Sequence, residues 1–436
     1  MSNIKVTIVG GASITWLPIF IKDLCACKEI QGGELVLHDL NMDALVPMKA
    51  FCEKVMEEKG AKFNIILEGD LEKSITDATI VLCNVLIGGH KTWEKEINKI
   101  LEYGIAHPKG MSVGPGGMIM GIKQIPYIVE LAQLMEKVCP NAWLLNYSNP
   151  MQCITLAAQK YSKTKTIGLC HGVTHSILKY CEWLGIDRKE VSVRCGGVNH
   201  FELVMEFVKD GKDLLPELIA KMDTLEIDGS EFGDLITKEM YKIFGALPTN
   251  HDIHSIEFYP HFLKRNTKLE NYRLKQNNVA VRMSDGKKRW EKAYAYTKGE
   301  IPLDDIIKEH ETEMLDSIIH TIVTNEPMVL DANITNNGCI RNLPDDVCVG
   351  VPVVLGRDGY KGVNVGEIPL GLDAMQYLHA TIQKFIVDAA MTGNKQSIVK
   401  ALTLDPMCYD LSYSERNNLI DDLLEIAKDY LPAFNK

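Results

Sequence analysis

The chain has 436 residues, of which 46% are hydrophobic and 24% are charged, and its formal net charge is −11. This composition is typical of a globular protein and excludes wholesale disorder. The basic residues are scattered rather than gathered, which excludes an electrostatic surface for nucleic acid. The length exceeds what one hydrophobic core usually organises, so we expect two domains.

The first residues form a strand-like run, 4–9, rather than the basic region, apolar stretch and cleavage site of a secretory signal. No window reaches the roughly 20 apolar residues that a membrane-spanning helix needs. The 12 cysteines are dispersed and mostly lie in apolar segments, where we expect reduced thiols. These features predict a cytoplasmic protein without a membrane partner.

The first 190 residues alternate apolar strand-like runs with helical patterns. Continuous apolar runs of this kind are typical of parallel strands covered by helices on both faces. The predicted strands are 4–9, 34–38, 63–67, 79–83, 142–145 and 166–170, and the predicted helices are 16–28, 42–59, 121–138 and 151–161. We therefore predict an α/β chain with a Rossmann-like, doubly wound, mostly parallel sheet over residues 1–190.

The pattern changes after residue 190. Alternating segments at 191–193 and 202–208 and the turn Asp210-Gly211-Lys212 indicate an antiparallel hairpin. Helices are predicted over 303–324, 372–392 and 414–433. We predict a second, α+β domain over residues 191–436, with a small-molecule site where the two domains meet.

A candidate cofactor loop follows the first strand. Gly10, Gly11, Ala12 and Ser13 form a turn in which backbone N–H groups and a helix N-terminus can face a pyrophosphate. The match to the dinucleotide fingerprint is incomplete, and an ordinary strand-to-helix turn also fits. Asp39 ends the second strand, where such folds place the carboxylate that binds the adenosine ribose, and an acidic residue there favours NAD over NADP.

Polar residues also follow the fifth and sixth predicted strands. Asn149 should lie at the carboxyl edge of the sheet near the nicotinamide, although Ser-Asn-Pro is also a common turn. Cys170 ends the sixth strand, and His200 lies 30 residues later (200 minus 170). A thiolate and an imidazole suit a metal ion, and two ligands leave positions open for substrate and water. Taken alone, the pair fits a structural role as well.

Asp252, between His251 and His254, belongs either to a solvated turn or to a catalytic base site.

Taken together, these motifs resemble family 4 of the glycoside hydrolases, the NAD- and manganese-dependent group. The resemblance covers nearly the whole chain. Its segments are 8–13, 88–104, 113–117, 147–150, 170–173, 197–200 and 342–344. It implies the architecture of lactate and malate dehydrogenases, with an oligomerising second domain, and we expect a homodimer or a homotetramer.

The resemblance also implies ligands and a reaction. Cys170 and His200 would hold Mn²⁺, Asn149 and Asn199 would bind the substrate, and residues 10–13 with Asp39 would hold NAD. In the implied reaction, hydride transfer from sugar C3 to NAD acidifies the C2 proton, and the leaving group departs from C1 with metal assistance.

The resemblance also implies which residues are the catalytic groups. Asp252 is similar in placement to the acidic residue that takes the C2 proton in some α-specific members, whereas other members use a tyrosine. His171 is the second catalytic candidate and also a substrate contact. Members that cut 6-phosphoglycosides commonly have Asp or Asn after the metal cysteine, so a histidine there resembles the α-glucosidase, α-galactosidase and α-uronidase branch.

The glycone is the finest inference from the resemblance. Gly172 resembles the α-glucuronidase form, so a glucuronide or galacturonide is the first choice, before an α-glucoside or α-galactoside. Met120 stands where many relatives have an arginine, and Lys123 and Arg341 are candidates for binding a substrate carboxylate.

Three alternatives remain at this level. They are a 6-phospho-glycosidase of the same family, a 2-hydroxy-acid dehydrogenase and a nicotinamide-binding sensor without catalysis. A dehydrogenase shares the cofactor domain but gives no role to the pair Cys170 and His200.

Overall fold

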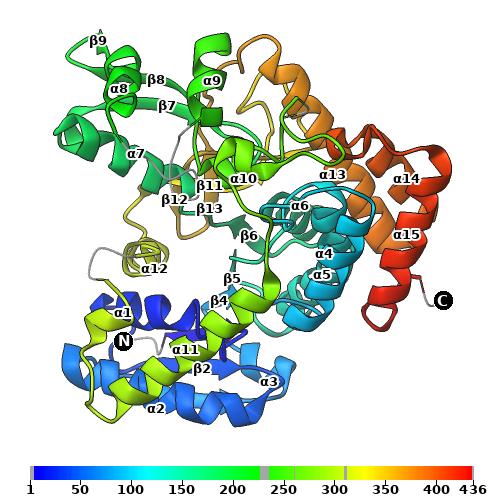
Figure 1. Cartoon of the computed structure of the whole chain (residues 1–436). Coiled ribbons are helices and arrows are strands. Elements are labelled where there is room, and N and C mark those ends of the chain that lie inside the picture. The colour runs from blue at the N-terminus through cyan, green and yellow to red at the C-terminus, as the bar shows by residue number, and fades with distance from the viewer. Residues whose placement is uncertain (1–3, 226–234, 260, 309–311, 435–436) are drawn as a thin grey trace.

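A nine-stranded sheet runs through the middle of the molecule (Figure 1). The computed structural model describes residues 4–225, 235–259, 261–308 and 312–434. The first six strands are β1 (Lys5–Val9), β2 (Glu34–His38), β3 (Asn64–Glu68), β4 (Ile80–Cys83), β5 (Trp143–Asn146) and β6 (Lys165–Gly168). They are parallel and lie in the order β3-β2-β1-β4-β5-β6, the order of a dinucleotide-binding fold. The predicted doubly wound sheet is confirmed.

Three antiparallel strands extend this sheet beyond β6. They are β11 (Met328–Thr335), β12 (Cys348–Gly356) and β13 (Gly359–Gly362). β11 joins the parallel part through the pairing of Asn333 with Gly168, and β12 and β13 follow in order. Strands from both sides of residue 190 therefore share one sheet, an arrangement that the sequence does not indicate.

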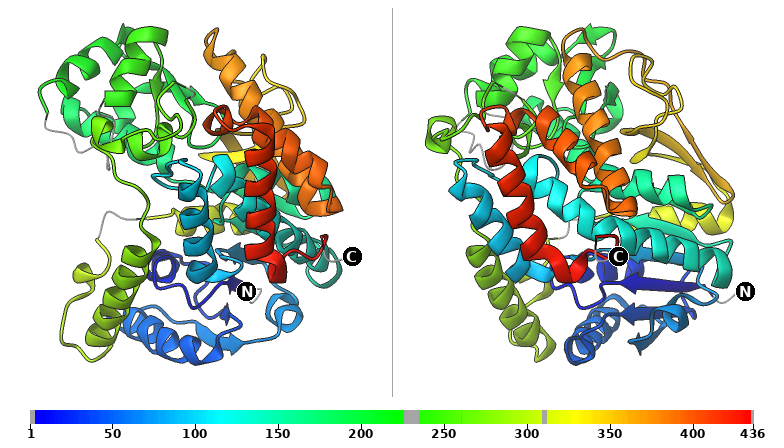
Figure 2. Two further views of the ribbon diagram at one scale, coloured as in Figure 1. Left: turned by 45° about the vertical axis from the view of Figure 1, so that its right-hand side comes forward. Right: turned by 90° about the vertical axis from the view of Figure 1, so that its right-hand side faces the viewer.

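Helices cover both faces of the large sheet (Figure 2). Those of the first half are α1 (Leu17–Ala26), α2 (Met42–Lys59), α3 (Leu71–Ile75), α4 (Gly89–Glu102), α5 (Gly114–Val138) and α6 (Met151–Tyr161). From the second half, α13 (Leu372–Thr392) packs on α5 and α6, and α15 (Tyr413–Ala427) packs on α4. α14 (Lys395–Leu404) lies between α13 and α15. α11 (Val279–Thr297) crosses back to contact α2 and α4.

Local sequence signals account for several helix ends. The side chain of Asn41 accepts a hydrogen bond from Ala44 N at the start of α2, and Gly60 ends this helix with a positive φ of 69°. Ser412 and Glu415 form a capping box at the start of α15. Such signals place helix boundaries without help from tertiary contacts.

A smaller sheet forms a separate lobe with α7 (Gly172–Leu184) and α8 (Leu215–Met222). Its strands are β7 (Ser192–Gly196), β8 (Leu203–Lys209), β9 (Lys212–Asp213) and β10 (Leu247–Pro248), with α9 (Leu235–Phe244) and α10 (Asp252–Ser255) nearby. The predicted antiparallel pairing is present between β7 and β8, but the turn at Asp210 and Gly211 joins β8 to β9. The connection between β7 and β8 instead carries Asn199 and His200.

The helix predicted over 303–324 is shorter than expected. A 3₁₀ turn spans Leu303–Asp305 and α12 spans Leu315–Thr324, while 309–311 lie outside the described residues. The 12 cysteines are free thiols, and all except Cys170 are buried. Within the residues that the structure describes, no helix has the length and apolarity needed to span a membrane.

Candidate active site

The predicted cofactor loop follows β1 and turns sharply beside the end of β4. Gly10 has a φ of 91°, and a Cβ there would lie 2.9 Å from the backbone oxygen of Asn84. Gly10 N and Gly11 N donate to the carbonyl oxygen of His38 at 3.0 and 2.8 Å. Only glycine allows the chain to pass this close to the end of β4.

The remaining predicted cofactor residues surround this turn. An oxygen of the Asp39 carboxylate accepts from Ala12 N at 3.2 Å, and the hydroxyl of Ser13 accepts from Trp16 N at 3.3 Å, ahead of α1. Both polar atoms of the Asn84 amide are buried without a partner. Such unpaired groups are costly unless a ligand satisfies them. Because this amide lies where the strand order reverses, the residues present fit a dinucleotide.

The structure brings Cys170 and His200 together. Cys170 follows β6, His200 lies in the connection between β7 and β8, and Cys170 Sγ is 3.6 Å from His200 Nε2. Two ligands of one metal ion have about this separation when each lies about 2.0–2.3 Å from the ion at tetrahedral angles. His200 has a φ of 65°, a strained conformation for a residue with a side chain. The backbone at His200 thus adopts an uncommon conformation, and in this conformation the imidazole lies beside Cys170.

The protonation of this pair suits metal binding. Burial lowers the pKa of His200 to about 3, so its imidazole is neutral near pH 7. His200 Nδ1 shares a 2.8 Å hydrogen bond with Ser112 Oγ, which leaves Nε2 to face the thiol. Burial raises the pKa of Cys170 to about 12. The thiol is therefore protonated until a cation displaces the proton.

Two amide oxygens of predicted site residues are also unpaired. Asn149 Oδ1 and Asn199 Oδ1 are buried without a hydrogen-bond partner. Asn199 Nδ2 donates to Glu202 Oε1 at 3.1 Å, which fixes the orientation of its amide. No third His, Cys, Asp or Glu joins the pair within the described ranges. A thiol, an imidazole and unpaired amide oxygens fit a divalent ion such as Mn²⁺ with open positions.

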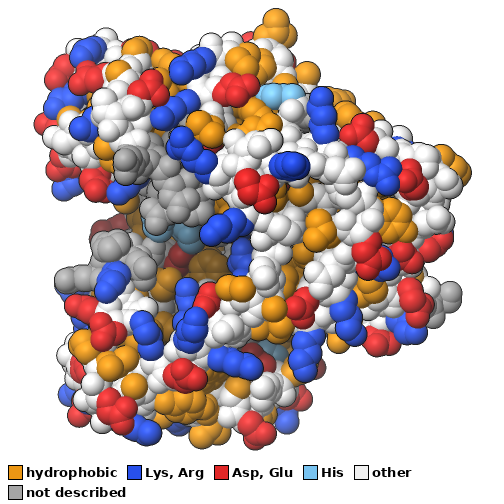
Figure 3. All heavy atoms as spheres, in the orientation of Figure 1, with side chains coloured by type: hydrophobic (Ala, Val, Ile, Leu, Met, Phe, Trp, Pro, Cys, Tyr) orange, Lys and Arg blue, Asp and Glu red, His pale blue; other side chains and the backbone are white. Residues whose placement is uncertain are grey.

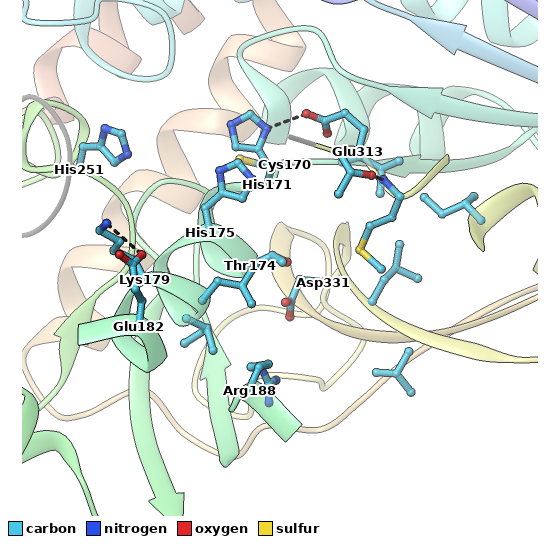
Figure 4. A pocket seen from close by; sticks show the side chains of 18 residues that line it. Cys170, His171, Thr174, His175, Lys179, Glu182, Arg188, His251, Glu313 and Asp331 are labelled. Atoms are coloured by element: carbon cyan, nitrogen blue, oxygen red, sulfur yellow. Dashed lines mark hydrogen bonds and ion pairs between the residues drawn. The ribbon is translucent and has the colours of Figure 1, made fainter. Parts of the chain in front are cut away.

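A pocket of about 1090 Å³ opens beside Cys170 and extends along α7, α12 and β11 (Figure 4). The space-filling view shows the molecule hollowed on one side, with histidine side chains inside the hollow (Figure 3). The pocket is lined by Cys170, His171, His251, Glu313 and Asp331, among others. This volume exceeds that of a single sugar ring, so a leaving group fits beside the glycone.

His171 is paired with a carboxylate at the entrance to this pocket. His171 Nδ1 lies 2.9 Å from Glu313 Oε1. The side chain of Glu313 is only 5% exposed. Asp23 on α1 holds this segment, since its carboxylate accepts from Glu313 N at 2.8 Å and from Thr312 Oγ1 at 3.0 Å. The pairing orients the imidazole.

Asp252 occupies a different environment from the one predicted for it. It is fully buried. Its carboxylate accepts from Ile236 N at 2.9 Å and from both Thr237 N and Thr237 Oγ1, at 3.1 and 2.6 Å. It therefore caps the first turn of α9. A carboxylate whose two oxygens are engaged in this way is poorly placed to accept a proton, and the geometry does not favour the predicted role as the C2 base.

The two candidates for a carboxylate-binding cation are placed elsewhere. Lys123 Nζ forms a fully buried ion pair of 2.7 Å with Glu96. Arg341 is exposed and does not line the pocket. Lys123 is therefore buried and paired with Glu96. This corrects the prediction that Lys123 is a candidate for binding a substrate carboxylate.

Sequence reasoning missed Ser112, Glu313 and Asn84. Ser112 directly precedes the glycine-rich segment 113–117, which was a usable signal. Asn84 directly follows a predicted strand, the position from which Asn149 was recognised. Glu313 lies 142 residues from His171, and nothing in the sequence indicates their contact.

Comparisons with known proteins identify the family of the chain. The family model described as "Family 4 glycosyl hydrolase" matches residues 5–181, and the model of the family's C-terminal domain matches 195–408. An α-galactosidase of Bacillus subtilis (strain 168) is 29% identical over 442 residues, covering 99% of each chain. An α-galacturonidase of Lachnoclostridium phytofermentans is 26% identical, covering 99% of this chain and 97% of that protein.

Solved structures agree on the fold. A 6-phospho-β-glucosidase of Thermotoga maritima, solved with manganese, NAD⁺ and glucose-6-phosphate, superposes with a TM-score of 0.81 at 19% identity, covering 98% of this chain and 99% of that one. A lactate dehydrogenase from a deep-sea metagenome library superposes with a TM-score of 0.51 at 17% identity, covering 90% of this chain and 100% of that one, in line with the predicted dehydrogenase-like architecture. With family models matching both halves of the chain, the predicted membership is confirmed, and this protein is a family 4 glycosyl hydrolase.

Proposed function

We propose that this hydrolase cleaves α-glycosides by NAD- and Mn²⁺-dependent oxidation and elimination, and that a uronic acid is its first-choice glycone. The observation that carries this proposal is the 3.6 Å separation of Cys170 Sγ and His200 Nε2 at the carboxyl edge of a dinucleotide-binding sheet. Relatives named α-galactosidase and α-galacturonidase support the choice of an α-glycoside.

When bound, NAD supplies a reversible hydride acceptor for sugar C3, and Mn²⁺ supplies a Lewis acid for charge on the sugar oxygens. Cys170 and His200 would hold the metal. Asn149 and Asn199 would present their unpaired amide oxygens to the metal or to sugar hydroxyls. Such contacts would hold the sugar ring in one orientation at the site.

His171 is the proposed acid that protonates the leaving-group oxygen. Its hydrogen bond to Glu313 stabilises the protonated imidazole, and its place in the pocket puts it beside Cys170. For the C2 base, the sequence proposes Asp252, whereas the hydrogen bonds give Asp252 a structural role at α9.

A substrate panel tests the proposal. p-Nitrophenyl α-glucuronide, α-galacturonide, α-glucoside and α-galactoside and the 6-phosphoglucosides are incubated with NAD, Mn²⁺ and a reductant. We expect cleavage of the uronides first and no net formation of NADH. Cleavage of 6-phosphoglycosides alone would support the phosphorylated branch instead, and oxidation of lactate or malate with stoichiometric NADH would support a dehydrogenase.

A matched pair of cysteine variants tests the metal site. Cys170→Ser should weaken Mn²⁺ binding and abolish most cleavage, because a hydroxyl is a poorer ligand than a thiolate. Cys181→Ser changes a buried thiol on α7 that lies outside the pocket lining, and it should retain activity. If Cys170→Ser cleaved glycosides as fast as Cys181→Ser and wild type, the metal mechanism would be excluded.

The homodimer or homotetramer and the cytoplasmic location stay predictions. Light scattering tests the oligomeric state.

A further inference from the structure

The pocket beside Cys170 continues well beyond the metal pair. Its lining includes one face of α7, on which His171, Leu178 and Glu182 follow one another. At about 1.5 Å per residue, the stretch from His171 to Glu182 is roughly 16 Å long. Sites for drug-sized ligands measure about 300–1,000 Å³, and this pocket measures about 1090 Å³. It therefore has room for a second sugar ring along α7.

β11 lines the same pocket and is the neighbour of the strand that leads to Cys170. Asn333 on β11 pairs with Gly168 on β6 in antiparallel register. Two residues beyond this pair, in the same direction, lie Asp331 on β11 and Cys170 after β6. The register brings these two positions level at the edge of the sheet, where neighbouring strands are about 4.8 Å apart. Asp331 thus lies one strand away from the metal pair.

The order of the strands places the cofactor loop and β11 on opposite sides of Cys170. From the cofactor loop after β1, the sheet continues through β4, β5 and β6 to β11. Asn84 and Asn149 lie beyond the ends of β4 and β5, and Cys170 lies beyond the end of β6. In the proposed reaction, sugar C3 has to face the nicotinamide for hydride transfer. The space on the β11 side of the metal pair is therefore left for the group that departs from C1.

Among the described residues that line the pocket, Asp331 is the only carboxylate without an ion pair. Glu182 is paired with Lys179 at 3.0 Å, and Glu313 is paired with His171 at 2.9 Å. Asp331 is half-buried on β11. Its carboxylate oxygens therefore keep hydrogen-bonding capacity that a ligand in the pocket can use.

Thr174 and Arg188 line the pocket near Asp331 (Figure 4). Burial raises the pKa of Asp331, and the charge of Arg188 and a hydrogen bond with Thr174 oppose this rise. Arg188 Nη1 donates to the carbonyl oxygen of Val191 at 3.0 Å, which holds the guanidinium. Arg188 forms no ion pair with any carboxylate in the part of the chain that the structure describes. One acidic and one basic group thus line the same space without neutralising each other by direct contact.

Exposed apolar side chains flank these polar groups. Val329 on β11 is 63% exposed and Leu178 on α7 is 48% exposed, and both line the pocket. Val329 and Asp331 lie on one face of β11, because side chains alternate along a strand. A sugar ring carries C–H groups as well as hydroxyls. It can therefore cover the apolar side chains while its hydroxyls bind the polar ones.

We propose that the stretch of the pocket between α7 and β11 binds a neutral sugar as the leaving group, and that Asp331 and Arg188 bind its hydroxyls. This inference rests on the proposed function, because it takes the glycone to sit at the metal pair. A diol can donate one hydrogen bond to the carboxylate and accept another from the guanidinium. An ionic leaving group would be attracted by one of these residues and repelled by the other. A neutral sugar satisfies both residues.

Two substrates with the same glycone test this assignment in the full-length enzyme with NAD and Mn²⁺. One is the α-linked disaccharide of the preferred glycone with glucose, and the other is the methyl α-glycoside, which has no second ring. The measured quantity is kcat/KM for the disaccharide divided by kcat/KM for the methyl glycoside. Asp331→Asn and Arg188→Gln should each lower this ratio by about tenfold, because each removes a charge-assisted hydrogen bond to the second ring.

Two features of the variants keep the test decisive. Asp358→Asn changes an exposed carboxylate in the turn between β12 and β13, outside the pocket lining, and should leave the ratio at the wild-type value. Arg188 is exposed, so Arg188→Gln still tests the subsite if Asp331→Asn fails to fold.

Several results would overturn the assignment. One is an equal loss of kcat/KM on both substrates in a variant whose thermal unfolding matches wild type, since the residue would then act on the glycone or on the chemistry. A second is an unchanged ratio in both variants. A third is dissociation of an oligomer in either variant by light scattering, which would assign this face to a subunit contact. A fourth is faster cleavage of a disaccharide with a uronic acid as leaving group, if Arg188→Gln removes that preference.

The same experiments distinguish failure of the subsite from failure of the proposed function. If wild type cleaves the methyl glycoside and Asp331→Asn and Arg188→Gln leave the ratio unchanged, the redox hydrolase stands and the subsite falls. If wild type cleaves no glycoside, the proposed function falls, and calorimetric titration with the disaccharide decides the subsite by itself. Binding that Asp331→Asn or Arg188→Gln weakens supports the subsite, and binding that is absent or unchanged in both variants overturns it.

Discussion

Substituting Asp252 separates a catalytic base from a helix cap. Its carboxylate accepts three hydrogen bonds in the first turn of α9, from Ile236 N and from the amide and hydroxyl of Thr237. Hydrogen bonds to a charged group contribute about 1.5–3 kcal/mol each, and loss of a helix cap alone costs about 0.5–2 kcal/mol. Because the three bonds share one carboxylate, we expect Asp252→Ala to destabilise the protein by about 3 kcal/mol. Asp252→Asn keeps one acceptor oxygen and should cost about 1 kcal/mol.

The assay follows both stability and the C2 proton. Unfolding midpoints in urea give the loss of stability for each variant. The deuterium isotope effect on kcat/KM, measured with a substrate labelled at C2, reports whether proton abstraction has changed. If Asp252 caps α9, Asp252→Asn should unfold earlier than wild type but keep its kcat and its isotope effect.

The opposite result would refute this reasoning. Removal of a general base typically lowers the rate by about 10²- to 10⁴-fold. A fall of this size in Asp252→Asn, with a wild-type unfolding midpoint, would identify Asp252 as the C2 base. The hydrogen bonds to α9 would then describe only a resting arrangement of the site.

Three further substitutions test neighbouring contacts. Glu313→Gln should lower kcat/KM by about 10- to 100-fold for methyl glycosides and much less for p-nitrophenyl glycosides, because a poor leaving group depends more on proton donation by His171; equal losses would contradict this positioning role. Ser112→Ala should weaken Mn²⁺ binding by about tenfold through His200, with kcat recovered at saturating metal; unchanged metal affinity in a titration would exclude the contact as a positioning bond. Burial raises the pKa of Asp23 from 3.8 to about 6, so its contribution to stability is complete below pH 3.8 and is lost as the pH rises through 6. Relative to Asp23→Asn, the thermal unfolding midpoint of wild type should therefore fall between pH 4 and 6, and parallel profiles would contradict this linkage.

Residues at strand ends could be predicted from sequence because local rules place them. Continuous apolar runs identify the six parallel strands, and the carboxyl ends of parallel strands meet at one edge of a sheet. This reasoning located Gly10 and Asp39 at the cofactor loop, and it located Asn149 and Cys170 at neighbouring strand ends. The structure places all four at that edge.

Contacts between distant segments could not be predicted. The pairing of His171 with Glu313 depends on Asp23, on α1, which holds the segment before α12. The sequence around any one of these residues does not indicate that the three segments meet. The same limit explains Lys123, because only the structure shows that its charge is neutralised by Glu96. A lysine that sequence reasoning expects in water can lie in the interior when it is paired.

The extension of the large sheet by β11 to β13 explains why the metal pair needs both halves of the chain. Gly350 on β12 and Gly197 exchange backbone hydrogen bonds of 2.7 and 3.0 Å, which tie the small sheet to the large one three residues before His200. A Cβ on Gly350 would lie 2.6 Å from Glu202 Oε1, the atom that orients Asn199. A side chain at position 350 would therefore move Glu202, then Asn199 and the adjoining His200. Since Cys170 follows β6 of the same large sheet, the separation of Sγ and Nε2 is set by the junction of the two sheets, and neither half of the chain contains the site alone.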